Sequence, residues 1–162
     1  EKVDFFKHKV ENVQYSKEEF EQAMAMKKAF MKDSLACNIL RQSEMQKVMI
    51  VTKKFTYEDI DFSLDVRCKW DLWMNSLNWG GDLKSTTATT QKQFEEAVRF
   101  FDYDRQRAWY MDIAGSNQDV LIGVSKVNFK VFKVPIRRGD ELYKSGFQKY
   151  NHLAFQWWTL FS

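Results

Sequence analysis

The sequence predicts a single α+β domain in which a mainly antiparallel β-sheet has helices packed on one face. The chain has 162 residues, a length typical of one domain. A strictly alternating run from Ile60 to Leu72 predicts a long strand with one buried face. A clear helix start at Ser16 precedes an apolar helical stripe. We therefore expect residues 1–15 to form an N-terminal arm and residues 16–162 to form the globular α+β domain.

The composition excludes several protein classes. The chain holds 14 Phe, 6 Trp and 6 Tyr but only 6 Gly and 1 Pro, which excludes a disordered or collagen-like chain. Two cysteines cannot build a disulfide framework, so we expect a reducing compartment and not secretion. No apolar run approaches the roughly 20 residues that span a bilayer. The chain starts at Glu1 and not at Met, as we expect of a trimmed or processed chain.

Three segments have helix signals. Ser16 and Glu19 have the spacing of a capping box, and Asp33 is placed to end this first helix and to cap a second one that runs past Leu40. Thr90 is predicted to cap a helix over residues 91–103, with its apolar residues on one face.

The remaining apolar segments are predicted to be strands. A β-branched run over residues 48–56 predicts the first strand, and the alternating run predicts the second. In the second strand we expect one face to be buried and the other exposed, with Cys68 a small hydrophobe of the buried face. The buried face comprises Ile60, Phe62, Leu64, Val66, Cys68 and Trp70, and the exposed face comprises Asp61, Asp65, Arg67 and Lys69. Further strands are predicted over residues 107–113, over residues 121–134 with a bulge or bend, and over residues 153–161. Pro135 is expected either to end the strand over residues 121–134 or to mark a sheet edge.

Residues 75–90 are predicted to form a long loop centred on Gly80 and Gly81. On this loop Trp79 and Leu83 are expected to point outward and to mediate self-association into an open polymer. The alternative is that Trp79 folds back over the core as a lid.

The basic residues are concentrated in the last quarter of the chain. From residue 120 onward the sequence contains seven basic residues and two acidic ones, although the net charge of the whole chain is only +3. A basic surface favours an anionic partner, either the phosphates of RNA or an acidic, peripherally bound membrane surface. The alternative is a solvated surface without a partner. The predicted binding residues are Lys126, Lys130, Lys133, Arg137, Arg138, Lys144 and Lys149.

No motif in the sequence marks a catalytic or metal site. His8 and His152 lie far apart, neither cysteine has metal-ligand spacing, and no phosphate-binding glycine loop or nucleophile elbow occurs. One acidic set is compatible with a Mg²⁺-dependent nuclease, but its spacing carries no signal of its own. Its members are Asp112, Asp140, Glu141 and Lys144. We therefore expect a non-enzymatic protein with no catalytic residue, no cofactor and no metal.

The order of elements in residues 60–134 resembles the globular domain of rhabdovirus matrix proteins. The matching pieces are the alternating strand, Glu96-Ala97-Val98 with Phe101-Asp102, the segment from Trp109 to Gly115-Ser116-Asn117, and the segment from Leu121 to Val134. The resemblance implies a viral structural protein that self-associates and bridges the nucleocapsid and the inner face of the membrane, in the host cytoplasm and the virion.

Two alternatives stay open. The first is a nucleic-acid-binding viral accessory protein of the movement or silencing type, which would use residues 126–149. The second is an enzyme whose site the sequence does not mark.

Overall fold

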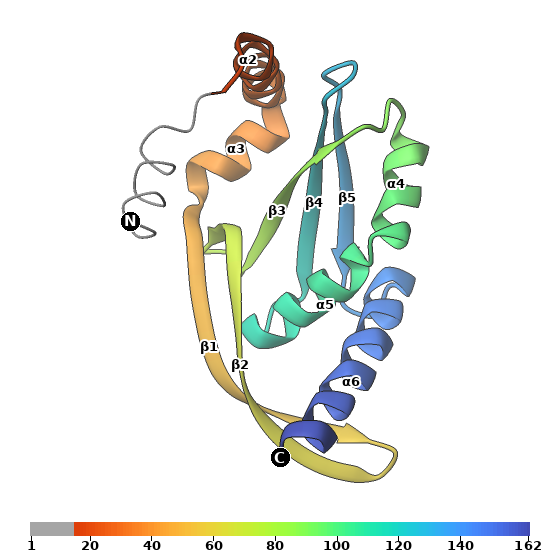
Figure 1. The fold of residues 1–162 in the computed structure, drawn as a ribbon. Helices are drawn as coiled ribbons and strands as arrows, with labels where there is room; N and C mark the ends of the chain where they lie inside the picture. The colour runs from red at the N-terminus through yellow and green to blue at the C-terminus, as the bar shows by residue number, and fades with distance from the viewer. Residues whose placement is uncertain (1–14) are drawn as a thin grey trace, which may run out of the picture.

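The computed structural model describes residues 15–162, whose strands form one five-stranded sheet in the order β1-β2-β3-β4-β5 (Figure 1). β1 (Glu44–Tyr57), β2 (Ile60–Met74) and β3 (Trp79–Thr86) form an antiparallel meander. β4 (Gln118–Ser125) runs parallel to β3, and β5 (Val131–Arg137) runs antiparallel to β4. The predicted α+β domain with a mainly antiparallel sheet is confirmed. The predicted N-terminal arm, apart from Tyr15, lies outside the described residues.

The five helices in the described part of the chain are divided between the two faces of the sheet. α2 (Lys17–Lys32) and α3 (Ser34–Gln42) lie against one face, while α4 (Gln91–Phe100), α5 (Tyr103–Ala114) and α6 (Glu141–Phe161) lie against the other (Figure 1). Each face therefore has its own apolar core. None of these five helices is both long and apolar enough to cross a bilayer.

Two separate clusters of buried side chains make up these cores. The smaller one comprises Phe30, Ala36, Ile39, Leu72, Met74, Val120, Ile122 and Val124. The larger one joins β2, β4 and β5 to the helices α4, α5 and α6, and includes Phe62, Val66, Trp70, Phe94, Ala108, Met111, Leu121, Tyr150 and Ala154. A sheet buried on both faces explains why its middle strands lack simple alternation.

The predicted helix starts are confirmed. Ser16 and Glu19 form a reciprocal capping box, in which Glu19 N donates to Ser16 Oγ at 3.0 Å. Asp33 ends α2 and caps α3, because its Oδ1 accepts from Ala36 N at 3.0 Å. Thr90 Oγ1 accepts from Gln93 N at the start of α4.

β2 has the predicted two faces over most of its length. Phe62, Val66, Cys68 and Trp70 are buried, and the four charged residues between Asp61 and Lys69 are exposed. Leu64 is half-buried. The burial predicted for Ile60 is wrong, because it lies where the hairpin leaves its turn and pairs with Tyr57 beyond the main core.

The long loop predicted over residues 75–90 is wrong, because residues 79–86 form β3 at the centre of the sheet. The two glycines signal close packing and not a turn. A Cβ on Gly80 would lie 2.2 Å from Leu72 O and 2.7 Å from the Trp70 ring. A Cβ on Gly81 would lie 2.9 Å from Val120. Only glycine lets the neighbouring strand and the tryptophans approach this closely.

Three predicted strands differ from the observed elements. Residues 107–113 belong to α5, in which Asp104, Arg107, Ala108 and Met111 share one buried helical face. Residues 153–161 belong to α6, which begins already at Glu141. In both segments aromatic residues favoured a strand, but the buried positions repeat at three and four residues. Residues 121–134 contain two strands, because the predicted bend is a complete reversal between β4 and β5. Pro135 lies on the edge strand, as predicted.

Candidate functional site

Two charged side chains of β3 point toward α5. Asp82 and Lys84 are two residues apart, so the alternation of a strand places them on the same face. Lys84 Nζ lies 2.7 Å from Asp82 Oδ2, and the Asp82 side chain is almost completely buried. Lys84 Nζ also lies 4.7 Å from the centre of the Tyr103 ring, at the start of α5. The lysine is thus held between a carboxylate and an aromatic face.

A second carboxylate comes from the adjacent strand. Asp71 Oδ2 accepts a hydrogen bond from Leu83 N at 2.9 Å, so the Asp71 carboxylate lies against the backbone between Asp82 and Lys84. Asp71 Oδ1 accepts from Gln46 Nε2 at 3.0 Å. Gln46 has a φ of 58°, a left-handed conformation that interrupts β1 opposite Asp71. The side chain of Asp71 therefore helps to join β2 to β3, because its carboxylate accepts the hydrogen bond from the backbone N–H of Leu83.

Arg107 of α5 binds Asp82 from the buried side of the site. Its side chain is fully buried, with Nη1 2.9 Å from Asp82 Oδ1 and Nε 2.9 Å from Asp119 Oδ2. Its guanidinium lies 4.9 Å from the Trp70 ring and 4.4 Å from the Tyr110 ring. Burial acts against the charged guanidinium, but attraction by Asp119 and Asp82 outweighs it and raises the pKa of Arg107.

Asp119 is the buried end of the charge cluster. Burial raises the pKa of Asp119 to about 6, because desolvation and repulsion by Asp82 outweigh the attraction of Arg107. Asp119 lies at the start of β4 in register with Gly80, so the parallel β3–β4 pairing brings it to Arg107. One arginine thus serves two carboxylates in a site closed to water.

The carboxylates fit a divalent cation. Within residues 15–162 no three or more His, Cys, Asp or Glu side chains gather to hold a metal by themselves. Mg²⁺ commonly takes only one or two protein carboxylates and completes its shell with water and substrate phosphate. Asp71 and Asp82 supply that number. Asp82 Oδ2 is ion-paired with Lys84 Nζ, and its second lone pair is the position that would bind the cation.

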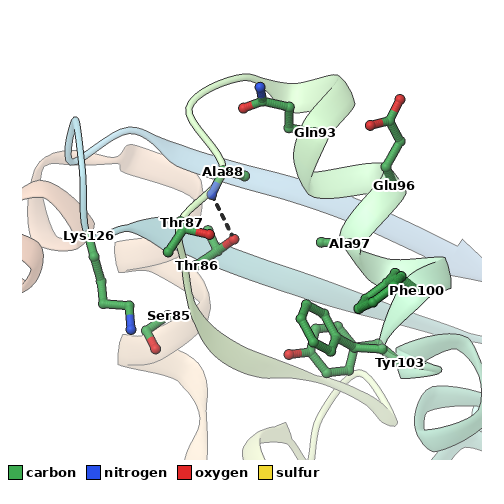
Figure 2. Close-up of a pocket in the computed structure, with 11 residues that line it drawn as sticks. Ser85, Thr86, Thr87, Ala88, Gln93, Glu96, Ala97, Phe100, Tyr103 and Lys126 are labelled. Atoms are coloured by element: carbon green, nitrogen blue, oxygen red, sulfur yellow. Dashed lines mark hydrogen bonds between the residues drawn. The ribbon is translucent and has the colours of Figure 1, made fainter.

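A hollow opens beside this group. It encloses about 600 Å³ and begins at Ser85, one residue after Lys84 (Figure 2). Tyr103, whose ring faces Lys84, also lines it. The hollow is thus adjacent to the charged group through Ser85 and Tyr103.

The seven predicted anion-binding residues differ in their ionic contacts. Four of the seven form ion pairs: Lys133 with Asp33, Arg138 with Asp112, Lys144 with Glu141, and Lys149 with Asp102 and Asp104. Lys126, Lys130 and Arg137 form no ion pair with any other described residue. Of the seven, Lys126 alone lines the hollow beside Lys84.

Trp79 and Leu83, predicted to mediate self-association, stand on β3 and not on a protruding loop. Both are partly buried and pack against the smaller core. The argument for an outward-pointing Trp79 therefore loses its structural basis.

The nuclease-like set considered from the sequence forms no group of three metal ligands within residues 15–162. Asp112 is bound by Arg138, Tyr143 and Tyr150, whereas Lys144 pairs with Glu141. Cys68 is buried as predicted, and burial raises the pKa of its thiol to about 11.

The site residues predicted from the sequence did not include Asp71, Asp82, Lys84, Arg107 and Asp119. A signal was present in Asp82-Leu83-Lys84, an acid and a lysine two residues apart, 11 residues after Asp71. This spacing indicates a common site only if residues 79–86 form a strand beside β2, which places Asp82 and Lys84 on one face near Asp71. The prediction of a loop for these residues therefore hid the site.

Comparison with known proteins gives the following matches. The crystal structure of SSO0001 has a TM-score of 0.48 and 6% sequence identity, covering 95% of this chain and 68% of that chain. The crystal structure of a phage related exonuclease from Haemophilus somnus 129PT has a TM-score of 0.47 and 15% identity, covering 90% of this chain and 75% of that chain. No curated protein matches the chain.

A protein-family model matches residues 1–158 and is described as a PDDEXK-like domain of unknown function, DUF3799. This match overturns the resemblance to rhabdovirus matrix proteins, which rested on an order of elements common to many α+β domains. The family match also contradicts the predicted viral roles, both structural and accessory. The predicted partners, namely a polymer of the chain itself, a nucleocapsid and a membrane, are wrong for the same reason. The prediction of a non-enzymatic protein, which rested on the absence of a recognised catalytic motif, is also overturned by this match.

The family description can be compared with the site residue by residue. Read as one-letter codes, PDDEXK ends in an acidic residue, any residue and lysine, as in Asp82-Leu83-Lys84. The earlier aspartate corresponds to Asp71, which follows Trp70 where the letters have proline. The side chains that fit the pattern are thus the ones that meet at the β2–β3 junction. The chain belongs to the DUF3799 family of PDDEXK-like domains.

Proposed function

We propose that this protein is a nuclease that hydrolyses phosphodiester bonds of nucleic acid with a divalent cation held by Asp71 and Asp82. The observation that carries the proposal is the hydrogen bond from Leu83 N to Asp71 Oδ2, which joins a second carboxylate to the Asp82-Leu83-Lys84 segment. Two carboxylates and a lysine at one sheet position match what phosphodiester hydrolysis needs, namely cation ligands and a positive charge near the phosphate.

The proposed roles follow from the contacts of each residue. Asp71 and Asp82 hold the cation, which when bound supplies Lewis acidity and lowers the pKa of water. Lys84, fixed by Asp82 and Tyr103, places an ammonium where negative charge develops on the phosphate oxygens. Arg107 is a positioning residue, because it is fully buried and acts on the substrate only through Asp82.

The reaction is a simple displacement. Water adds its oxygen to phosphorus, the bond from phosphorus to one ester oxygen breaks, and that oxygen leaves with a proton. The products are a phosphate monoester and a free hydroxyl group.

The test is a cleavage assay with purified protein and fluorescently labelled DNA and RNA of one sequence, single-stranded and duplex, with Mg²⁺ or with EDTA. We expect cleavage in Mg²⁺ that EDTA abolishes. We expect Asp82→Asn and Lys84→Met each to lower the rate by about 10²-fold or more, the usual effect of removing such a group.

The matched controls are Asp65→Asn and Lys69→Met, which change the same residue types at exposed positions of β2. Both are expected to cleave at the wild-type rate. Thermal melts of all variants check that they fold. The proposal is overturned if the wild-type protein cleaves none of the substrates in Mg²⁺ or Mn²⁺, or if folded Asp82→Asn and Lys84→Met cleave as fast as the controls.

A further inference from the structure

The hollow beside Lys84 has an unusual wall of exposed aromatic side chains. Phe100, at the end of α4, is 81% exposed, and Phe101, which caps this helix, is 58% exposed. The two rings meet edge to face at 4.9 Å, and Phe101 stacks on Tyr103 at 5.6 Å with an interplanar angle of 25°. Such side chains cover no core, so their exposed faces are available to a flat ligand.

The opposite wall is polar and carries a positive charge. Lys126 lies beside Ser85, across the hollow from Phe100 and Tyr103, and Glu96 points away from these two rings (Figure 2). Ser85, Thr86 and Thr87 add hydroxyl groups. Hydroxyl and ammonium groups are the usual side-chain partners of backbone phosphates.

The position of Lys126 is fixed by the fold. Lys126 N donates to Thr86 O at 2.8 Å, and Gln22 Nε2 of α2 donates to Lys126 O at 3.1 Å. The turn between β4 and β5 is therefore held against the end of β3 from both sides. The two walls form one preformed groove, and Tyr103, which lines it, contacts Lys84.

We propose that this groove binds the unpaired nucleotides of a nucleic-acid strand, with bases stacked on Phe100 and Phe101 and phosphates toward Lys126 and Lys84. The inference rests on the proposed nuclease function and names its substrate as a single strand or a single-stranded end. In a duplex both faces of each base are covered by its neighbours, whereas an unpaired base can lie on an aromatic ring. Stacking on aromatic rings tolerates every base, so little sequence preference is expected.

The test measures binding by fluorescence anisotropy, with a labelled 12-nucleotide single strand and the matching duplex, in EDTA so that nothing is cleaved. The double variant Phe100→Leu/Phe101→Leu keeps apolar bulk but removes the rings. We expect it to weaken single-strand binding at least about fivefold, which corresponds to the lower end of one stacked base, with little effect on the duplex. Phe161→Ala, which removes an exposed ring at the end of α6, is expected to bind like the wild type.

Lys126 is tested through the salt dependence. Each phosphate contact on a single strand contributes about 0.7 to the slope of log affinity against log salt concentration, so Lys126→Ala is expected to reduce the slope by about that amount. Lys144→Ala, at an exposed position of α6, is expected to leave the slope unchanged.

The outcomes separate this inference from the proposed function. The inference is overturned if the Leu double variant binds the single strand as tightly as the wild type, or if it loses single-strand and duplex affinity equally. If the aromatic variant loses single-strand affinity but the wild type never cleaves, the groove stands and the nuclease proposal fails. If cleavage depends on Asp82 but the variants of Phe100, Phe101 and Lys126 bind as tightly as the wild type, the nuclease proposal stands and the groove proposal fails.

Discussion

Arg107 is the residue on which the buried charges depend. One guanidinium faces the two carboxylates of Asp82 and Asp119, each at 2.9 Å, in a place that water does not reach. A buried charge is costly even when it has a partner, because it loses its hydration. Burial is the main cause of the raised pKa of Asp119, and repulsion by Asp82 adds to it. Asp119 is thus the member of the cluster that takes up a proton most readily.

This protonation predicts a pH dependence of stability. The folded-state pKa of Asp119 is about 6, above the ordinary value of 3.8, so the folded protein binds this proton more tightly than the unfolded chain. The contribution to the free energy of unfolding is therefore present below about pH 4 and is lost as the pH rises to about 6. At about 1.4 kcal/mol per pKa unit, the loss amounts to about 3 kcal/mol.

The measurement is urea denaturation of the wild type and Asp119→Asn between pH 4 and pH 7. Asparagine cannot ionise, so we expect the wild type to lose stability relative to this variant across that range. Asp65→Asn, an exposed change on β2, is the control and is expected to follow the wild type. A constant difference between wild type and Asp119→Asn at all pH values would contradict the assignment of the proton to Asp119.

The candidate site could be predicted only in part from the sequence. Asp82 and Lys84 lie two residues apart in the printed chain, but Gly80 and Gly81 before them and the hydroxyl residues after them favoured a loop. On a loop two charges have no common face. Arg107 and Asp119 come together only through the parallel pairing of β3 with β4, which no local pattern encodes.

At the scale of elements, the packing of α6 against α5 depends on Gly146. A Cβ at this position would lie 2.1 Å from the backbone oxygen of Asp104 and 2.9 Å from Ala108 Cβ. Backbone atoms cannot move aside as a flexible side chain can. The two helices therefore approach each other through a residue without a side chain, and α5 in turn carries Arg107 to the site.

We expect Gly146→Ala to destabilise the protein by about 1–3 kcal/mol, the usual cost of overpacking, although alanine by itself favours a helix by about 1 kcal/mol. The measurement is the free energy of unfolding in urea. Gln148→Ala, at an exposed position of the same helix, is the control and is expected to change little. An increase in stability for Gly146→Ala would show that α6 does not pack as described.

Elements with strong local signals were predictable, and those set by distant packing were not. The caps at Ser16, Asp33 and Thr90 and the alternation of β2 depend on neighbouring residues, and all appear in the structure. β3 and α6 depend on what surrounds them. Their glycines and aromatic residues are explained by contacts with strands and helices far along the chain, so their sequences alone favoured a loop and a strand.

Over the whole molecule, much of the charge is distributed in ion pairs. The excess of basic residues after residue 120 is real, but four of its seven members form ion pairs, three of them with acidic residues of other elements. Lys133, for example, joins β5 to the junction of α2 and α3 through Asp33. The positive charge near the groove is therefore local, which agrees with a partner recognised over a few nucleotides.

The position of β3 between an antiparallel and a parallel neighbour has a consequence for the order of folding. β2 reaches β3 through a short turn, whereas β4 reaches it only after the whole α4–α5 crossover. Contacts between distant segments form more slowly than local ones, since a longer loop must close first. The β1–β2 hairpin and the helices are therefore expected to form before Asp119 meets Arg107.

A chain that has regained its helices and its hairpin would thus still lack a finished site. In refolding from urea we expect far-ultraviolet circular dichroism to recover first and the cleavage activity of samples withdrawn over time to recover later. Newly made chains would therefore pass through a period in which they have secondary structure but no cleavage activity. For the proposed nuclease, such a delay would postpone cleavage until the site is complete.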